Sequence, residues 1–566
     1  MRSARPAAFT IAAAALLLAG CTTNAPLLGD DPKTACESLA AQTIDAVRLA
    51  LPGQASGSAS IDSATLVAAS PLTVAERGAT PAGMITPATP QHCRVLGRIA
   101  PLTAGAEPIS FQVNLPTRWN GRSVQYGGGG FNGVLITGLA LAPGQPYDAP
   151  SPLALGYVTA GTDSGHRNQP GASPMAFAAN DEMLANFAHA AYPKVRNVSV
   201  ELMRRAYGRA PTKLYFVGSS EGGREGLMLA QRYPDAFDGI FSRVPVINWT
   251  GLQFAGTRNG AALFGDGWLG PAQVKLVHES QLAACDALDG VADRVIADIE
   301  GCRRAFNVAS LQCAAGGKPE TCLNAAQLRA VQTLRTPLKL PFALANGVAE
   351  YPGWGIGGED TPAFGPTGGW RAWWTGNAPP TLPPQPANGI AWVYGSGAVL
   401  HFYARDAAAD PRRVSPESVA ARVREVSALM DATNPDLAAF HARGGKLIVL
   451  EHLGDYAQSP YAGIRYIDAV QQRLGSVRTR EFLRLYTAPG VDHVGTGAPA
   501  LVDALAALSR WVEDGPAPER LTISEQNARL PFAPVRARPL CEWPRWPRYR
   551  SGDVNAAASF ECVASN

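Results

Sequence analysis

The feature that most constrains this chain is a Gly-x-Ser-x-Gly pentapeptide at residues 218–222. A β-prone apolar run precedes it at 215–217, and a helix-capable run follows at 227–233. A strand that turns sharply into a helix here forms a nucleophile elbow, in which the glycines allow close backbone approaches. Such a turn lifts the Ser220 hydroxyl above a sheet and leaves the Glu221 amide at a helix start, where it can donate to an oxyanion.

A glycine-rich loop upstream offers a second donor for that oxyanion. Four consecutive glycines, residues 127–130, follow a predicted strand and let the backbone approach another group closely. Loops of this kind supply an oxyanion amide in ester hydrolases, and we expect the amide of Gly130 to have this role. The alternative is a flexible surface loop, which would be the better interpretation without Ser220 downstream.

A carboxylate and a histidine follow the serine in the order that α/β hydrolases use. The buried strand predicted at 444–450 leads to Asp455, our candidate for the triad acid, with Glu451 as the fallback. His493 is the only histidine after Asp455, which makes it the candidate base. His166 lies upstream of the nucleophile, so we interpret it as structural or as lining the site.

Between residues 248 and 437 the strand-helix alternation is lost, and the chain becomes irregular and rich in glycine, proline and tryptophan. We therefore predict an α/β-hydrolase fold with a large inserted lid: a catalytic domain at 22–247 and 438–566, and the lid at 248–437. The lid aromatics could line an apolar pocket for an aromatic acyl group, with only one or two of the rings touching substrate. These residues are Trp354, Trp370, Trp373, Trp374 and Trp392.

An acidic loop inside the lid, residues 285–295, crowds three carboxylates around a glycine. Calcium needs six to eight oxygen ligands, and this loop could supply most of them, although the spacing is not that of an EF-hand. From the residues alone, a solvated acidic loop is the better interpretation. The candidate ligands are the side chains of Asp286, Asp289 and Asp293 and the carbonyls of Val291 and Val295.

Composition excludes some classes of function. The chain has 566 residues, of which 46% are apolar and 17% charged, which argues against disorder. A net charge of +3 without a basic cluster gives no reason to expect nucleic acid as a partner.

The N-terminus has the pattern of an export signal. Arg2 and Arg5 precede an apolar run at 9–18 that is too short to span a bilayer, and residues 18–21 resemble a bacterial lipobox. We expect a lipoprotein signal peptide at 1–21 and an acylated Cys21, with the protein exported to the periplasm or the outer membrane. The alternative is an ordinary secretory signal that is cleaved nearby. Without Cys21, the nine cysteines become eight, an even count that suggests disulfides in an exported protein.

Together these residues resemble the tannase and feruloyl esterase family over most of the mature chain. The most specific elements are the run Gly-x-Ser-x-Gly-Gly-Arg-Glu-Gly from Gly218 and the Cys-Asp-x-x-Asp-Gly-x-x-Asp loop from Cys285. The resemblance implies that Ser220, Asp455 and His493 form a triad with Gly130 and Glu221 as oxyanion donors, and it favours structural calcium in the acidic loop. It also implies four disulfides: Cys36 with Cys93, Cys285 with Cys302, Cys313 with Cys322, and Cys541 with Cys562.

Two departures from the family pattern bear on stability and specificity. Members usually carry a disulfide between the residue before the nucleophile and the residue after the catalytic histidine, but here these residues are Ser219 and Val494. A terephthalate-ester hydrolase of the family grips the substrate carboxylate with a lid arginine; this chain has His401 there, with Arg405 one turn later. Gln458 stands where that enzyme has an aromatic residue. We treat these last three as candidate substrate-binding residues.

These observations predict a serine esterase that acts on small esters of aromatic acids, such as feruloyl or galloyl esters, through an acyl-enzyme. Two alternatives stay open besides a terephthalate-ester hydrolase. One is a catalytically inert, lipid-anchored binding protein on the same scaffold, and the other is a peptidase.

Overall fold

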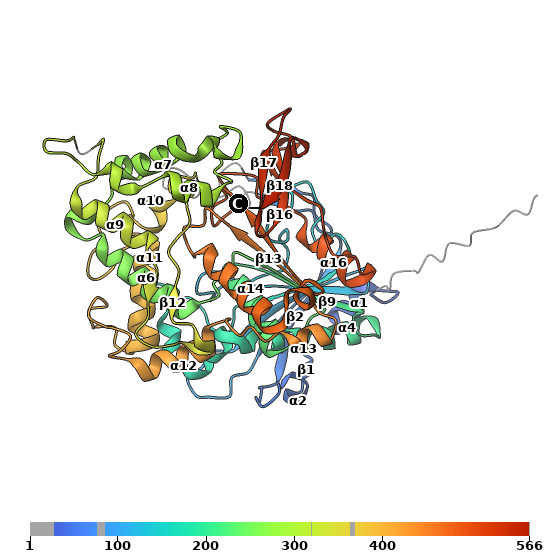
Figure 1. Ribbon diagram of the computed structural model, residues 1–566. Coiled ribbons are helices and arrows are strands. Elements are labelled where there is room, and N and C mark those ends of the chain that lie inside the picture. Colours follow the sequence, from blue (N-terminus) through green and yellow to red (C-terminus); the bar gives the residue numbers. More distant parts are fainter. Residues whose placement is uncertain (1–27, 76–84, 319, 363–367, 565–566) are drawn as a thin grey trace, which may run out of the picture.

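The computed structural model describes residues 28–75, 85–318, 320–362 and 368–564 (Figure 1). The predicted signal peptide and Cys21 lie outside the described residues.

A single large sheet forms the centre of the predicted catalytic domain. Its six middle strands run parallel, in the order β8-β7-β9-β10-β13-β14, and antiparallel strands extend it at both edges. The parallel strands are almost wholly buried because helices cover both of their faces. In the order β1-β2-β5-β6-β8-β7-β9-β10-β13-β14-β16-β15, the strands are Thr43–Ile44, Ala59–Val67, His92–Ile99, Ile109–Pro116, Val158–Thr162, Arg122–Tyr126, Lys213–Ser219, Gly239–Arg243, Lys446–His452, Leu483–Ala488, Pro534–Glu542 and Leu521–Gln526.

Alternate residues of the central strands face two different cores. Leu214 and Phe216 of β9 join the core that includes the helices α4 (Ala191–Tyr207), α5 (Glu221–Arg232) and α14 (Pro460–Leu474). Tyr215 and Val217 join the other core, which includes α16 (Ala504–Asp514). This period of two places α5 and α16 on opposite faces of the sheet. The shorter helices of this domain are α1 (Pro32–Glu37), α2 (Ala46–Leu49), α3 (Asp181–Ala185), α13 (Ala438–Ala442) and α15 (Ser476–Arg480).

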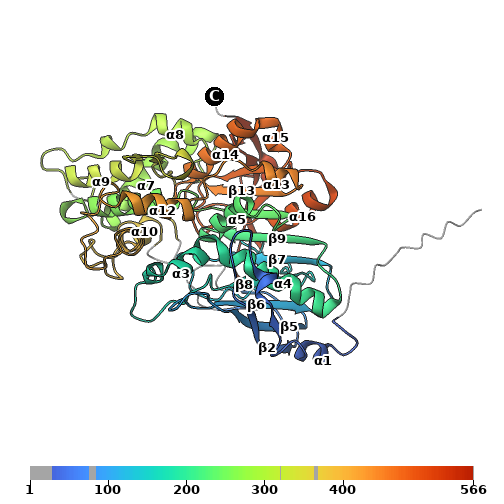
Figure 2. The same cartoon turned by 90° about the horizontal axis from the view of Figure 1, so that it is seen from below.

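The described part of the predicted lid segment contains the α-helices α6 to α12, so the expectation of an irregular chain holds only for the stretches between them. Its helices lie to one side of the sheet in both Figures 1 and 2. The sequence pattern hid some of them because α6 and α11 carry glycines, through which they pack: a Cβ on Gly395 would lie 2.7 Å from the amide nitrogen of Thr257. The helices are α6 (Trp249–Ala262), α7 (Pro271–Cys285), α8 (Ile299–Ala305), α9 (Ala325–Arg335), α10 (Trp370–Trp373), α11 (Ile390–Ala398) and α12 (Ala420–Met430).

Small two-stranded sheets complete the fold. They pair β3 (Thr73–Val74) with β4 (Ile85–Thr86), β11 (Leu338–Lys339) with β12 (Glu350–Tyr351), and β17 (Arg545–Tyr549) with β18 (Phe560–Ala564).

All four expected disulfides are present: Cys36–Cys93, Cys285–Cys302, Cys313–Cys322 and Cys541–Cys562. They indicate that the protein folds in an oxidising compartment outside the cytosol. Within the described ranges, no helix is both long and apolar enough to cross a membrane.

Candidate active site

The elbow between β9 and α5 has the geometry that the sequence predicts. Ser220 has φ 61° and ψ −120°, a strained conformation for a residue with a side chain. A Cβ on Gly218 would lie 2.1 Å from the carbonyl oxygen of Gly222, so only glycine fits there. The strained turn leaves the Ser220 side chain at the carboxyl end of the parallel strands, where ligand sites of such sheets lie.

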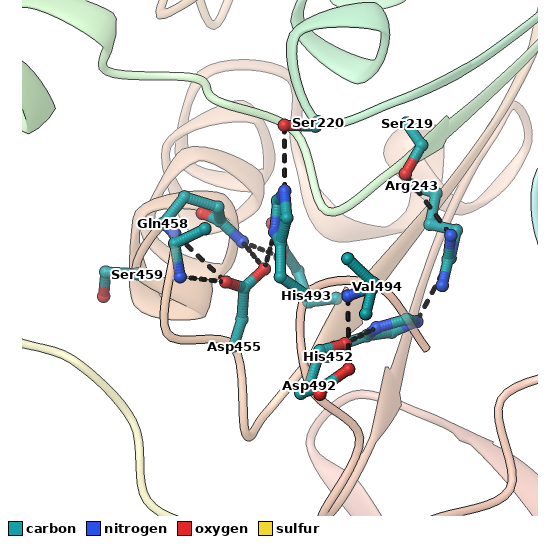
Figure 3. A network of polar contacts seen from close by, with 12 residues as sticks. Ser219, Ser220, Arg243, His452, Asp455, Gln458, Ser459, Asp492, His493 and Val494 are labelled. Atoms are coloured by element: carbon teal, nitrogen blue, oxygen red, sulfur yellow. Dashed lines mark hydrogen bonds and ion pairs between the residues drawn. The ribbon is translucent and has the colours of Figure 1, made fainter. Parts of the chain in front are cut away.

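Ser220, His493 and Asp455 form one hydrogen-bonded chain (Figure 3). Nε2 of His493 lies 2.9 Å from Oγ of Ser220, and its Nδ1 lies 2.7 Å from Oδ2 of Asp455. The three residues follow β9, β14 and β13, which are neighbours or near neighbours in the sheet. This arrangement lets the imidazole take a proton from the serine while the carboxylate orients the ring.

The Asp455 carboxylate is held by its own loop. Its Oδ1 accepts hydrogen bonds from the amides of Ala457 and Gln458, at 2.7 and 3.0 Å. The Gln458 side chain is buried and donates from Nε2 to Glu451, at 2.8 Å, and to Asp455, at 3.3 Å. Gln458 thus lies behind the acid, although the sequence suggested that it would bind substrate. Burial and the nearby Asp455 raise the pKa of Glu451 well above its usual range, which favours the neutral form of the fallback acid.

The two predicted oxyanion donors have free amides. Neither the Gly130 N–H nor the Glu221 N–H hydrogen-bonds to any of the described residues. Glu225 of α5 holds the glycine-rich loop, since its carboxylate accepts from the Gly128 amide at 2.9 Å and from Nδ2 of Asn132 at 2.5 Å. The loop is therefore fixed against α5, unlike the flexible surface loop that was the alternative.

The side chain of Glu221 points away from the site into a buried ion pair. Nε of Arg224 donates to it at 2.7 Å, and both side chains are almost fully buried. Arg224 also donates to the carbonyls of Ala188, Phe187 and Met430. Because Met430 ends α12, this arginine joins the elbow helix to the lid.

Lid and loop aromatics lie beside the triad. The Trp373 ring centroid is 5.9 Å from the ring centroids of His493, Tyr394 and Tyr456. Trp373 is only half-buried, whereas the other four lid tryptophans singled out above are buried in the core. The Tyr394 hydroxyl lies 3.3 Å from where a Cβ on Gly130 would stand. Tyr394 and Tyr456 were missed from the sequence, because neither belongs to a recognisable motif.

The two lid residues that were candidates for binding a substrate carboxylate, His401 and Arg405, have other surroundings. His401 is partly buried in a π-helical turn, Val399–Ala404, and burial lowers its pKa, so its ring is neutral at neutral pH. Arg405 follows this turn with φ 51° and pairs with Asp181. The spacing of four residues suggested that the two side chains share a helix face. They do not, because the helical turn ends before Arg405.

A buried polar chain connects the loops of Ser220 and His493 (Figure 3). Arg243, at the end of β10, donates from Nη1 to Oγ of Ser219 at 3.4 Å and from Nε to Nε2 of His452 at 3.3 Å. Nδ1 of His452 then donates to the Asp492 carbonyl at 2.6 Å. Burial and Arg243 hold the pKa of His452 well below its usual range, consistent with a neutral ring that accepts at Nε2. No motif signals this chain, which arises because pairing of β10 with β9 aligns Arg243 with Ser219.

His166 is structural, as the first of the two interpretations held. Its Nε2 lies 2.9 Å from the Phe131 carbonyl oxygen, and its ring stacks on Phe177. Burial lowers its pKa to about 4.

The acidic loop satisfies its carboxylates internally. Asp286 accepts from the amides of Asp293 and Arg294, Asp289 accepts from those of Val291 and Ala297, and Asp293 pairs with Arg538. In the part of the chain that the structure describes, no three His, Cys, Asp or Glu side chains are arranged to hold a metal ion. In this arrangement the carboxylates are engaged by loop amides and by Arg538, and calcium stays a prediction.

Comparison with known proteins places this geometry in a family. The family model described as tannase and feruloyl esterase matches residues 93–563. An uncharacterised esterase of Agrobacterium fabrum is 34% identical over 550 residues, covering 93% of each chain. The mono(2-hydroxyethyl) terephthalate hydrolase of Piscinibacter sakaiensis is 32% identical, with 86% of this chain and 87% of the other covered.

Solved structures agree on the fold. Feruloyl esterase B from Aspergillus oryzae superposes with a TM-score of 0.71 at 23% identity, covering 89% of this chain and 97% of the other. The tannin acyl hydrolase of Aspergillus niger gives 0.67 at 22% identity, covering 90% and 92%.

Proposed function

Because the chain belongs to the tannase and feruloyl esterase family, it is a carboxylic ester hydrolase, and we propose that it cleaves esters of aromatic acids with Ser220 as the nucleophile. The observation that carries this proposal is the hydrogen-bonded chain Ser220–His493–Asp455 with the half-buried Trp373 ring beside it.

The mechanism has two acyl-transfer steps. His493 takes the Ser220 proton as the oxygen attacks the ester carbonyl, and Asp455 stabilises the imidazolium that forms. The amides of Gly130 and Glu221 donate to the oxyanion of the tetrahedral intermediate. The imidazolium returns its proton to the leaving alcohol, and water then cleaves the acyl-enzyme by the same route. Losing one oxyanion donor typically costs about 100- to 1,000-fold in rate.

The residues around the site favour a neutral aromatic acyl group. Trp373, Tyr394 and Tyr456 offer ring faces and edges on which an aromatic acid can pack. The alternative substrate, mono(2-hydroxyethyl) terephthalate, carries a free carboxylate. Its recognition has less support, because His401 is neutral and Arg405 already pairs with Asp181.

The test is hydrolysis of a substrate panel by the purified protein and by Ser220→Ala. The panel holds methyl ferulate, methyl gallate, mono(2-hydroxyethyl) terephthalate and a short p-nitrophenyl ester. We expect serine-dependent turnover, fastest with one of the two neutral aromatic esters, and an unchanged circular dichroism spectrum for the variant. Equal rates in both proteins would remove Ser220 from the mechanism.

A fluorophosphonate probe separates the enzyme from an inert binding protein on the same scaffold. Such probes label only an activated serine, so we expect labelling of the wild type and none of Ser220→Ala. A peptidase is distinguished by comparing each ester with the amide of the same acid, and we expect turnover of the ester.

We also propose calcium as a structural ligand of the acidic loop. To bind there, the cation would have to displace Arg538 from Asp293 and some loop amides from the other carboxylates. The proposal predicts that calcium raises the melting temperature and that Asp289→Asn abolishes this rise. An equal melting temperature in calcium and in chelator would contradict it.

Finally, we propose that Cys21 carries a lipid anchor after export. Support comes from the lipobox-like sequence at residues 18–21. Expression in a bacterial host should give a protein that partitions into detergent, and Cys21→Ser should release it to the aqueous phase. Partition that is unchanged in Cys21→Ser would contradict the anchor.

A further inference from the structure

A cavity lies beside the candidate triad. Residues adjacent in sequence to Ser220 and His493 line this cavity. Its volume is about 290 Å³, near the lower end of the roughly 300–1,000 Å³ typical of small-molecule sites. Ser219, which precedes the nucleophile, and Val494, which follows the candidate base, both line it. These are the two positions that a disulfide usually joins in the family pattern, so the absence of that bridge coincides with open space.

One cationic side chain lines this cavity without forming an ion pair. Arg243 is only 8% exposed, and among the described residues the carboxylates that act on it, Asp492 and Asp455, do so from beyond ion-pair distance. Its two hydrogen bonds, to Ser219 and His452, are long, at 3.4 and 3.3 Å, and Nη2 has no partner in the described residues. Burial lowers the pKa of Arg243 only to about 10, so it is charged at neutral pH.

The nearest carboxylates are committed elsewhere. Asp492 accepts hydrogen bonds from the hydroxyls of Thr361 and Thr496 and from three amides of its own loop. Asp455 is bound to His493. A buried guanidinium with a free edge is a strong site for an anion, because burial in a low-dielectric environment strengthens the pairing.

The walls indicate what kind of anion fits. Leu141, Ala142, Ala500 and Leu501 line the cavity with apolar surface. Tyr147 also lines it, and its hydroxyl makes no hydrogen bond to a described residue, so it can donate to a ligand. The Nη1–Nη2 edge of a guanidinium matches the two oxygens of a carboxylate.

We propose that this cavity binds a small monocarboxylate with an apolar body, anchored by Arg243. Ester hydrolysis releases an acid of this chemical class, which makes a product-type acid the expected occupant. The proposal does not depend on the function proposed above, because binding can be measured without turnover.

The test is calorimetric titration with benzoate, and with benzamide as a neutral probe of the same shape. We expect benzoate to bind the wild type. Its affinity for Arg243→Gln should be at least tenfold lower, and its affinity for Arg243→Lys, which keeps the charge but not the planar edge, should be intermediate. Benzamide should bind at least tenfold more weakly than benzoate. Ala500→Leu, which fills the cavity and leaves Arg243 in place, should also weaken benzoate at least tenfold, and it keeps the test valid if the Arg243 variants fail to fold.

Two controls separate this cavity from the candidate active site and from general loss of charge. Trp373→Ala alters the aromatic wall beside His493, and Arg258→Gln removes another partly buried guanidinium, in the lid. Arg258→Gln should bind benzoate as the wild type does, and Trp373→Ala should weaken benzoate binding far less than Arg243→Gln does. If only Trp373→Ala lowered the affinity for benzoate, benzoate would bind in the active site and the proposal would be overturned. Equal affinity in all variants, or no binding to the wild type, would also overturn it. Binding of chloride or phosphate but not benzoate would also overturn it.

Discussion

Two buried carboxyl groups that lie four residues apart, Glu451 and Asp455, differ in their environment. Asp455 accepts two loop amides and faces His493. Glu451 has one neutral partner, Gln458, and its Oε1 has no partner among the described residues. Burial with so few partners raises the pKa of Glu451 and favours its neutral form.

The two carboxyl groups should therefore respond differently to the same conservative change. Asp455→Asn should lower kcat by about 10⁴-fold, the effect typical of losing a triad carboxylate, because an amide does not stabilise the imidazolium. Glu451→Gln replaces a neutral acid with a neutral amide and should change kcat less than tenfold. Steady-state kinetics of both variants with methyl ferulate decide between them. A larger loss in Glu451→Gln would make the fallback acid the true one.

Glu225 gives a second prediction at this scale, through the pH dependence of stability. Burial raises its pKa from 4.5 to about 7. Between these values the folded state binds more protons than the unfolded state, so the stability that Glu225 contributes falls as pH rises. Glu225→Gln cannot titrate. The melting temperature of the wild type minus that of the variant should therefore decrease from pH 5 to pH 8.

Glu182 supplies the control for this prediction. Its pKa is lowered, chiefly through hydrogen bonds from the backbone of Leu102 and Thr103 that outweigh its partial burial. It is therefore ionised in both states above pH 5, and the difference between the wild type and Glu182→Gln should stay constant. A constant difference for Glu225→Gln as well would contradict the raised pKa.

At the scale of elements, the short lid helix α10 matters because it brings Trp373 to the triad. Trp373→Ala should lower kcat/KM for methyl ferulate by roughly tenfold, since an aromatic contact adds about 0.5–1.5 kcal/mol to the burial of its area. The rate with p-nitrophenyl acetate should change little, because an acetyl group does not reach the ring. Trp268→Ala, another partly buried lid tryptophan whose indole binds the Thr375 carbonyl, is the control. Equal losses with both esters would mean that Trp373 only supports the fold.

Elements differ in how far the sequence predicts them. The elbow and the order of Ser220, Asp455 and His493 were predictable because each lies at a strand end with a local signal. The lid helices were not, since glycines and prolines interrupt their pattern. Arg243 and His452 were missed for a different reason: their contact depends on β10 and β13 pairing side by side, which no local pattern records. Gln458 was assigned to substrate by alignment, and only the turn after Asp455 shows that its side chain points to the acid.

At the scale of the whole molecule, Arg224 connects the elbow to two other parts of the fold. It pairs with Glu221, donates to the carbonyls of Phe187 and Ala188 before α4, and donates to Met430 at the end of α12. The residue whose amide we propose as an oxyanion donor is thereby connected to the lid. Docking of the lid and precise placement of Glu221 should depend on the same side chain.

This coupling can be measured with a double-mutant cycle. Arg224→Met leaves the Glu221 carboxylate buried without its cation, which typically costs about 3–5 kcal/mol of unfolding free energy. Glu221→Gln leaves Arg224 its three carbonyl partners and should cost less. In Glu221→Gln with Arg224→Met no charge is left unpaired, so urea unfolding should give a loss smaller than the sum of the single losses, by about 0.5–3 kcal/mol.

Activity of the same variants shows whether the connection reaches the oxyanion site. The carbonyls of Phe187, Ala188 and Met430 still lack their donor in the double variant, so the restored charge balance should recover stability without recovering kcat. Recovery of both would mean that only the charge matters, and strictly additive stability losses would mean that Glu221 and Arg224 do not act as a pair. A kcat that stays low in a stable double variant is the result expected if lid docking positions the Glu221 amide.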